Sequence, residues 1–416
     1  MRRRLRVLVS AYACDPAAGS EGAVGWDFVR AISANHEAWV VTAEFNELRL
    51  RAHPIPNVRF LYVRHRPWHY RPSPRWKQIE SSAFKPLMNL AYEAWLRDAF
   101  DLGRRLHAQY QFDLLHQLTY VGFRFPGYLW ELPIPFVWGP IGGAENTAWK
   151  LLPLMGLEGT VYYGARNLIN SAQLRWLPAP RHATRRPKVA LISATSGVRE
   201  VLRRSLGADS EVICEITRPE LDVVPQPSLR DSDEPLRLSW SGQHLAGKAL
   251  PILLKALALL PPPLPWRLDV LGDGPLTGEW KATAEKLGIG DRCTWHGWVA
   301  RKAAMALVGR SHVFVITSLK DLTSTVLVEA LTMGTPVIAL DHCGFRDAIT
   351  SECGVLVPTE PVRSLSHRMA IAIERIAGDE SFRRELSRGG LARASFFSRE
   401  HKARAVDEIY QRLAHE

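Results

Sequence analysis

Two successive series of short apolar runs, each run followed by a helical stretch, constrain the fold of this 416-residue chain more than any other feature. This alternation predicts parallel sheets covered by helices, and hence an α/β fold. In the first series the expected strands are Leu5–Tyr12, Trp39–Thr42, Val58–Val63, Asp113–Leu118, Phe136–Trp138, Val189–Ala194 and Glu211–Ile216. In the second series they are Leu236–Trp240, Arg267–Leu271, Arg292–Trp295, His312–Ile316 and Pro336–Leu340. Helices are expected between them at Lys248–Leu260, Gly278–Leu287, Ala300–Leu307 and Leu322–Met333.

The break between the two series predicts a domain boundary. Leu221–Glu234 contains prolines, is polar and has no periodicity, which is typical of a linker. The chain is also long enough for two domains with separate cores. We therefore expect an N-terminal Rossmann-like domain at 1–220, a linker at 221–235, a second Rossmann-like domain at 236–395 and a final helical segment at 396–416.

The composition is ordinary for a soluble globular protein, with 46% hydrophobic and 23% charged residues. No run approaches the roughly 20 apolar residues of a membrane-spanning helix. The basic and apolar N-terminus resembles a signal peptide, but Arg6 and Asp15 interrupt that pattern, so a first strand followed by a glycine loop explains it better. The five cysteines lack metal-type spacing, so we expect reduced thiols and a cytoplasmic location.

The net charge of +11 suggests an anionic partner. No zinc-finger or RNA-recognition pattern accompanies it, so nucleic acid is not expected. An anionic membrane surface fits better, because basic and aromatic side chains are interleaved ahead of an apolar, helix-like stretch. A solvated loop followed by a core helix explains this region equally well, and both interpretations stay open. The residues concerned are Arg64, Arg66, Trp68, His69, Tyr70, Arg71, Arg75, Trp76 and Lys77, then Phe84, Leu87, Leu90, Tyr92, Trp95 and Leu96.

The loop after the expected strand His312–Ile316 is the strongest candidate for a binding site. Asp321 lies in this loop, at the carboxyl end of a strand where open α/β sheets bind ligands, and Glu329 follows eight positions later in the next helix. Carboxylates that flank a helix start suit a sugar nucleotide, because carboxylates bind hydroxyls and helix-terminal amides bind phosphate. Taken singly, either acid would more simply be a helix cap or a solvated carboxylate. The N–H groups and hydroxyls at the helix start come from Leu322, Thr323, Ser324 and Thr325.

Glycine-rich loops in the first half provide further candidates. Gly19, Ser20 and Gly22 open an amphipathic helix after the first strand, where glycine lets a ligand approach the backbone and a helix start favours an anion. They do not spell G-x-G-x-x-G, so a dinucleotide site is weakly supported. An ordinary strand-to-helix turn is the alternative. Gly142 and Gly143 follow another expected strand and would line a site with backbone.

Two basic side chains complete the candidates. Lys248 begins an expected helix, where a cation opposes the helix dipole unless an anion binds there, and it would supply a point charge for a diphosphate. His116 lies near the end of the fourth expected strand, a place where a lone histidine is usually structural.

Residues 318–349, SLKDLTSTVLVEALTMGTPVIALDHCGFRDAI, resemble the donor-binding core of the retaining glycosyltransferases of family four. The E-x7-E motif of that family appears as Asp321 and Glu329, with aspartate in place of the first glutamate. Residues 240–248 are similar to the family's phosphate clamp, in which Lys248 matches and Gln243 stands where arginine is usual. The segments VSAYACDPAAGSEGAVGW and FVWGPIGG are similar to those of a bacterial subgroup.

The resemblance implies an α/β, GT-B fold, with two Rossmann-like domains that face each other across a cleft and a final helix that returns to the first domain. It implies a retaining enzyme that moves a hexose from a UDP- or GDP-linked sugar to an acceptor hydroxyl, without a metal or other cofactor. The acceptor would be a saccharide or a lipid-linked saccharide in envelope or exopolysaccharide assembly. The enzyme would be cytoplasmic, or peripheral to the inner face of the plasma membrane.

The resemblance also implies roles for individual residues. Glu329 would bind the ribose, Asp321 the sugar hydroxyls, and Lys248 with Gln243 the diphosphate. His116, Lys248 and Asp321 are the expected catalytic group. The expected donor-binding group also contains the loop residues Gly19, Ser20, Gly22, Thr323, Ser324 and Thr325, and Trp298 next to the base. Gly142, Gly143 and Glu145 are expected on the acceptor side.

Two other functions remain open at this point. A nucleotide-sugar epimerase with the same fold would use the donor without an acceptor. A non-catalytic subunit that binds a sugar nucleotide or glycan would explain both Gln243 and Asp321 as degenerate positions.

Overall fold

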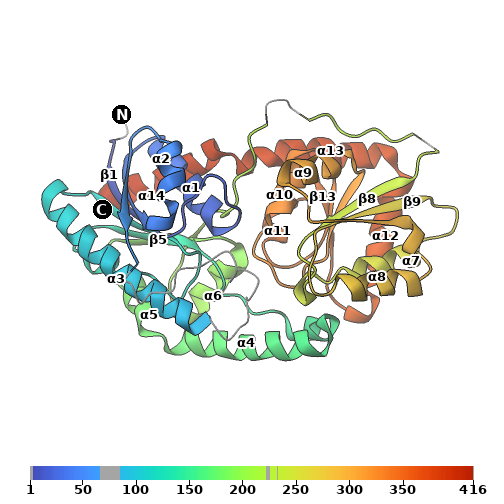
Figure 1. Cartoon of the computed structure of the whole chain (residues 1–416), viewed down its shortest axis with the longest axis horizontal. Helices are drawn as coiled ribbons and strands as arrows, with labels where there is room; N and C mark the ends of the chain where they lie inside the picture. The colour runs from blue at the N-terminus through green and yellow to red at the C-terminus, as the bar shows by residue number, and fades with distance from the viewer. Residues whose placement is uncertain (1–2, 66–84, 222–224, 232, 416) are drawn as a thin grey trace. The chain divides into compact units, whose positions relative to one another are not determined.

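The computed structural model describes residues 3–65, 85–221, 225–231 and 233–415 (Figure 1). It divides into two compact units. Unit 1 contains residues 1–144, 173–215 and 399–416, and unit 2 contains residues 145–172 and 216–398. No helix in the described segments is long and apolar enough to cross a membrane.

Unit 1 is built on a seven-stranded parallel sheet with the order β3-β2-β1-β4-β5-β6-β7. The chain starts in the middle of this sheet, extends it to one edge and then crosses to the other side of β1. The strand order therefore reverses between β1 and β4, which is the position where doubly wound sheets bind ligands. The strands are β1 (Arg6–Ala11), β2 (Glu37–Ala43), β3 (Val58–Val63), β4 (Leu114–Thr119), β5 (Phe136–Ile141), β6 (Val189–Ser193) and β7 (Glu211–Val212).

Helices cover the sheet of unit 1. The C-terminal helix α14 packs beside α1, and apolar side chains of both helices share one core with alternate residues of β1 (Figure 1). Because α14 fills this core with Val406, Ile409 and Tyr410, the end of the chain is part of the first unit. The helices are α1 (Glu21–Ser33), α2 (Glu47–Ala52), α3 (Lys85–Tyr110), α5 (Pro178–Thr184), α6 (Ser196–Leu206) and α14 (Arg399–His415).

Unit 2 repeats the same plan with a six-stranded parallel sheet in the order β10-β9-β8-β11-β12-β13. The order reverses between β8 and β11, so the loops after these two strands flank the switch point. Most of the expected strands lie within a residue or two of the observed ones. The strands are β8 (Leu236–Ser241), β9 (Trp266–Leu271), β10 (Cys293–Gly297), β11 (Val313–Ile316), β12 (Val337–Leu340) and β13 (Gly354–Val357).

Two helical layers enclose this second sheet. Helices α7, α8 and α12 share a core with alternate side chains of β8 and β11, while α9, α10 and α13 pack against one another. Two α/β units of this kind form the GT-B fold, so the predicted fold class is confirmed. The helices are α7 (Pro251–Ala258), α8 (Thr277–Lys286), α9 (Arg301–Arg310), α10 (Thr325–Thr332), α11 (Phe345–Ala348), α12 (Leu365–Gly378) and α13 (Glu380–Ala394).

The observed units differ from the predicted domain at 1–220 in an internal segment and at its end, where residues 216–220 already belong to unit 2. Residues 145–172, which include the 3₁₀ helix η5 (Trp149–Met155) and most of α4 (Gly156–Trp176), belong to unit 2. Leu151, Leu152 and Met155 lie in the core that β8 and α7 build, which explains the assignment. The segment therefore brings residues from the first half of the sequence to the second sheet.

The basic and aromatic stretch is described only in part, because residues 66–84 lie outside the described segments. Its described aromatic side chains belong to α3 and are buried: Tyr92 and Trp95 pack edge-on and stacked among the rings around Tyr12. For these residues the core-helix interpretation holds.

Candidate functional site

The loops after β8 and β11 bring Lys248 and Asp321 together at the switch point of unit 2. Lys248 Nζ lies 2.5 Å from Asp321 Oδ2, and both side chains are largely shielded from solvent. Lys248 belongs to a short 3₁₀ turn after β8, and Asp321 to the loop between β11 and α10. A cation and a carboxylate 73 positions apart in the sequence thus form one polar centre.

Buried hydrogen bonds fix the two loops to each other. Thr317 Oγ1 donates to the carbonyl oxygen of Lys248 at 2.7 Å and accepts from the indole N–H of Trp240 at 2.9 Å. The N–H of Leu319 donates to the carbonyl oxygen of Gly247 at 2.7 Å. Because Thr317 and Trp240 are buried, this arrangement holds the two loop backbones in place around Lys248 and Asp321.

Helix α10 begins three residues later than the sequence predicts. Ser324, the residue before the helix, has a φ of 76°, so the left-handed backbone at this position ends the loop and α10 starts at Thr325. The N–H of Leu322 donates to Asp321 Oδ1 at 3.1 Å and is therefore not free for a ligand, and Thr323 is buried. The amides that face outward in the first turn of a helix are those of its first residues, which here begin with Thr325.

Glu329 lies one turn into α10 and is almost completely buried. Its Oε1 accepts a hydrogen bond from Arg301 Nε at 2.5 Å, and Arg301 is the first residue of α9. Burial raises the pKa of Glu329, and Arg301 acts in the opposite direction and favours the carboxylate. Glu329 is therefore not a solvated helix residue, because it is buried and its carboxylate is hydrogen-bonded to Arg301. Arg301 did not stand out in the sequence, because nothing in its spacing connects it with Glu329.

A second lysine lies next to Asp321. Lys320 Nζ donates to the carbonyl oxygen of Glu145 at 2.5 Å, and burial lowers its pKa. The positive charge of Arg166, from α4, also lowers the pKa of Lys320, whereas the carboxylate of Asp321 raises it. Glu145, expected on the acceptor side of the first domain, thus lies in unit 2 beside the Asp321 loop. Neither Lys320 nor Arg166 belongs to a motif that would have singled it out in the sequence.

Close backbone packing shapes the loop that carries Gln243. Gly272, at a φ of 110°, follows β9, and a Cβ there would lie 2.0 Å from the carbonyl oxygen of Gly242. A Cβ on Gly274 would lie 2.8 Å from the carbonyl oxygen of His244. Gln243 itself is exposed. Trp298, at the end of the β10 loop, has 75% of its surface exposed, so its ring is accessible.

In unit 1 the loop between β1 and α1 lies at the other switch point. Ser20 precedes α1 with a φ of 52°, and a Cβ on Gly22 would lie 2.8 Å from that of Ala18, so Gly22 is needed for a compact turn. A Cβ on Gly19 would meet no atom within 4 Å. Glu21, which the sequence did not single out, accepts a hydrogen bond from the N–H of Val121 at 3.0 Å. Burial raises the pKa of Glu21 to about 7.

His116 is fully buried in the sheet of unit 1. Its Nε2 lies 2.7 Å from the carbonyl oxygen of Gly139, so Nε2 donates, and Nδ1 accepts from the hydroxyl of Tyr410 at 2.6 Å. Burial lowers the pKa of His116 to about 4, which agrees with a neutral ring. Both nitrogens are occupied, and we therefore assign His116 a structural role between β5 and α14 in place of the expected catalytic one. Gly142 and Gly143 follow β5 in the same unit, and Gly143 has a φ of 70°.

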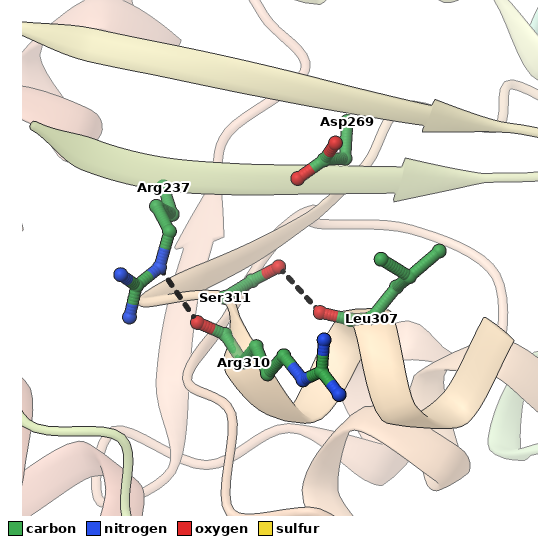
Figure 2. Close-up of a pocket in the computed structure, with 5 residues that line it drawn as sticks. All are labelled: Arg237, Asp269, Leu307, Arg310 and Ser311. Atoms are coloured by element: carbon green, nitrogen blue, oxygen red, sulfur yellow. Dashed lines mark hydrogen bonds between the residues drawn. The ribbon is translucent and has the colours of Figure 1, made fainter. Parts of the chain in front are cut away.

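Two other features lie apart from this site. Among the described residues, no group of three or more histidine, cysteine, aspartate or glutamate side chains has the arrangement of a metal site. A pocket of about 240 Å³ lies toward the amino-terminal ends of β8 and β11, opposite the loops that carry Lys248 and Asp321 (Figure 2). Arg237 is tied there to the carbonyl oxygen of Arg310 at 2.9 Å. The pocket contains none of the predicted site residues.

Comparison with known proteins connects this geometry to a family. Residues 226–390 match the family "Glycosyl transferases group 1". A lipopolysaccharide core biosynthesis glycosyltransferase of Rhizobium meliloti is 29% identical over 187 residues, which cover 44% of this chain and 50% of the relative. An alpha-D-kanosaminyltransferase of Streptomyces kanamyceticus is 25% identical over 222 residues, which cover 50% of this chain and 56% of the relative. The chain thus spans about half the length of these curated relatives.

A solved structure shares the fold over nearly the whole chain. The Anabaena protein HepE, crystallised in complex with UDP, matches with a TM-score of 0.62 and 16% identity, and the match covers 97% of this chain and 98% of that one. The family match lies within unit 2, and the structural match covers both units. The chain is thus similar to group 1 glycosyltransferases within unit 2, and it shares the GT-B fold over both units.

Proposed function

We propose that the chain moves a hexose from a nucleoside-diphosphate sugar, with uridine or guanosine as the nucleoside, to an acceptor hydroxyl, with retention of the anomeric configuration. The ion pair of Lys248 and Asp321 at the switch point of unit 2 carries this proposal. It joins a cation for the diphosphate and a carboxylate for sugar hydroxyls at the carboxyl ends of parallel strands, beside the start of a helix.

In this proposal the two carboxylates bind hydroxyl groups of the donor. Glu329 accepts from the ribose, and Arg301 orients its buried carboxyl group and favours the ionised form. Asp321 accepts from the hexose. Aspartate is one methylene shorter than the family's usual glutamate. The ion pair with Lys248 holds the carboxylate of Asp321 in one position. Trp298 offers an accessible ring for the base.

Positive charge then stabilises the leaving diphosphate. The bond between the hexose and the diphosphate breaks, the acceptor oxygen attacks from the same face, and a phosphate oxygen takes the acceptor proton. Lys248 and the amides of the first turn of α10 stabilise the charge that develops on the diphosphate. Gln243 donates hydrogen bonds without charge, and Lys320 and Arg166 provide positive charge near Asp321. We propose that this reaction needs no metal ion.

The relatives favour a role in saccharide assembly. One of them belongs to lipopolysaccharide core biosynthesis, so we propose a saccharide or lipid-linked acceptor in envelope or exopolysaccharide assembly, at the inner face of the plasma membrane. The other relative is named as an alpha-D-kanosaminyltransferase and not for lipopolysaccharide assembly. A small-molecule acceptor is the alternative within the same reaction class.

A non-catalytic subunit is the second candidate. Gln243 cannot neutralise a diphosphate, and Asp321 already neutralises Lys248, so the phosphate loop has less net positive charge than its lysine alone suggests. A protein of this kind would bind a sugar nucleotide without turnover. Replacing Gln243→Arg together with Asp321→Glu separates the two cases, because a degenerate subunit would gain turnover and an adapted enzyme would gain nothing or lose activity.

Calorimetry of the purified chain tests the proposed function. Uridine, guanosine and adenosine diphosphates and their hexose conjugates are titrated with and without magnesium. We expect one nucleoside series to bind in both conditions, and its hexose conjugate to transfer the sugar to saccharide acceptors, as mass spectrometry of the products would show. Absence of binding to every nucleotide would contradict the proposal, and conversion of the donor without any acceptor would identify an epimerase instead.

A further inference from the structure

Helix α4 lies directly against the loop after β8, the phosphate-clamp loop. A Cβ on Gly159 would lie 3.1 Å from that of Ala246, and a Cβ on Gly247 would lie 2.7 Å from the hydroxyl oxygen of Tyr163. Positions 159, 163 and 166 are spaced as i, i+4 and i+7, so they share one face of the helix. Arg166 therefore continues the face of α4 that packs on the phosphate-clamp loop.

Arg166 also lies within electrostatic reach of the groups around Asp321. Burial lowers the pKa of Lys320 and raises the pKa of Tyr163. The charge of Arg166 lowers both of these pKa values, and the carboxylate of Asp321 raises both. Lys320 and Tyr163 thus each lie close to both Arg166 and Asp321, and all four residues belong to unit 2.

Positive charge is in excess around Asp321. Lys248 forms an ion pair with Asp321 at 2.5 Å. Lys320 Nζ instead donates to the uncharged carbonyl oxygen of Glu145, and the carboxylate of Glu145 acts on Lys320 only as a nearby charge. Arg166 is exposed and makes no hydrogen bond or ion pair with another residue in the described part of the chain. Three cations therefore face two carboxylates, which suits an anionic group of a ligand.

The hydroxyl of Tyr163 is a neutral donor beside the same loop. The ring of Tyr163 packs against the core of unit 2, and the residue is half-buried. Its hydroxyl makes no hydrogen bond with any residue that the structure describes. A tyrosine hydroxyl in such a position normally has a hydrogen-bond partner, so this one can donate to a ligand at the phosphate-clamp loop.

We propose that Arg166 supplies the positive charge that Gln243 lacks, by binding the phosphate group next to the hexose of the donor, and that Tyr163 donates to the same group. This role of Arg166 rests on the proposed function, in which Asp321 binds the hexose, so the phosphate bonded to that hexose is the one within reach of Arg166. A guanidinium group suits it, because it can donate two parallel hydrogen bonds to a phosphate. Helix α4 thereby becomes part of the donor site, although it lies outside the residues that match the family.

Calorimetry of the full-length chain, with the nucleoside series that the unmodified chain binds, tests this proposal. Arg166→Gln should weaken the affinity for the nucleoside diphosphate by at least about 10-fold, because it removes a hydrogen bond between two charged groups. The nucleoside monophosphate lacks the phosphate group next to the hexose, so its affinity should change by less than about 3-fold. Tyr163→Phe should weaken the diphosphate by about 2- to 10-fold. Arg384→Gln on α13 is the matched control, because it removes the same charge from another exposed position of unit 2 and should bind like the unmodified chain.

A second substitution shows whether Arg166 replaces the missing clamp arginine. In the Arg166→Gln background, Gln243→Arg should restore the diphosphate affinity to within about 3-fold of that of the unmodified chain. In the presence of Arg166, Gln243→Arg should gain less, because the phosphate group already has its arginine. A purely structural effect of Arg166→Gln would not be rescued by a new charge on another loop.

Three outcomes would overturn the role of Arg166 and leave the proposed function standing, because the unmodified chain binds the nucleotide in each of them. The first is an unchanged diphosphate affinity of Arg166→Gln. The second is an equal loss of affinity for the monophosphate and the diphosphate, which would place Arg166 away from the phosphate next to the hexose. The third is a loss that Gln243→Arg does not rescue. Absence of nucleotide binding by the unmodified chain would overturn both proposals together.

Discussion

At the scale of single residues, the buried neutral ring of His116 should make unit 1 sensitive to acid. Its pKa is about 4 in the folded chain and about 6.5 in the unfolded chain, so the unfolded chain binds the proton first. This contribution to stability is complete above pH 6.5 and is lost as the pH falls toward 4. Between pH 7 and pH 5 the loss is about 2 kcal/mol. Urea denaturation at the two pH values, monitored by hydrogen exchange of peptides from β4, measures this loss of stability.

The variant His116→Gln isolates this effect. It has no titrating ring, so its loss of stability between pH 7 and pH 5 should be about 2 kcal/mol smaller than that of the unmodified chain. The other buried histidines titrate in both proteins and cancel in the comparison. His53→Gln is the control, because His53 is exposed. An unchanged pH dependence in His116→Gln would show that the ring is not buried neutral.

His116 also shows how a residue of the expected type can have another role. A histidine at a strand end was a reasonable donor contact, but burial and the two hydrogen bonds to Gly139 and Tyr410 explain its position. Tyr410 lies 294 positions away in the C-terminal helix. The sequence alone therefore could not indicate that Tyr410 is a hydrogen-bond partner of His116.

The placement of the candidate residues was easier to predict than the contacts that hold them. The positions of Lys248, Asp321 and Glu329 in one unit, at one end of a sheet, follow from the strand–loop–helix pattern. Arg301 and Lys320 meet their partners only through folding, since 28 and 175 positions respectively separate the two members of each pair. No periodicity in a single sequence encodes such a distance.

At the scale of elements, strands were predictable and helix starts were less so. Buried parallel strands are continuous apolar runs, and β3, β9 and β11 lie within one residue of their predicted bounds. Helix α10 starts late because Ser324 adopts a left-handed backbone, a local choice that the serine does not reveal. The inward side of α4 mixes the polar Asn167 and Asn170 with Tyr163, so no apolar periodicity indicated that most of this helix belongs to unit 2.

The close approach of the β9 loop to the β8 loop leads to a prediction about Gly272. Its φ is 110°, and a Cβ at this position would lie 2.0 Å from the carbonyl oxygen of Gly242, which leaves no room for a side chain. Gly272→Ala should lower the unfolding free energy by about 2–4 kcal/mol and weaken nucleotide binding, because it displaces the loop that leads to Lys248. Thermal unfolding and calorimetry measure the two effects.

Gly278→Ala, in the first turn of α8, is the matched control for this prediction. A Cβ at Gly278 meets no atom within 4 Å, so alanine should be neutral or stabilise the chain by up to about 1 kcal/mol. Equal stability and equal nucleotide affinity of the two variants would refute the role of Gly272 in placing the loop.

At the scale of the whole molecule, the two series of apolar runs correctly indicated two Rossmann-like units with the same kind of strand order. Each unit has its own core, so each can be understood from its own residues. Unit 2 begins at residue 216, ahead of the predicted linker at 221–235. The chain also exchanges two segments: residues 145–172 join unit 2, which the prediction missed, and residues 399–416 join unit 1. The second of these exchanges was implied by the family resemblance and not by periodicity.

The switch point of unit 2 should bind the nucleotide part of a sugar donor, and this is the central claim about the molecule. Calorimetry of Glu329→Ala against the nucleotide that the unmodified chain binds tests it most directly, with Glu374→Ala as the control because Glu374 is exposed on α12. Hydrogen bonds to a charged group contribute roughly 1.5–3 kcal/mol, so we expect about a 10- to 100-fold weaker affinity for Glu329→Ala. The Glu374→Ala variant should bind like the unmodified chain. An affinity of Glu329→Ala equal to that of the unmodified chain would contradict the claim.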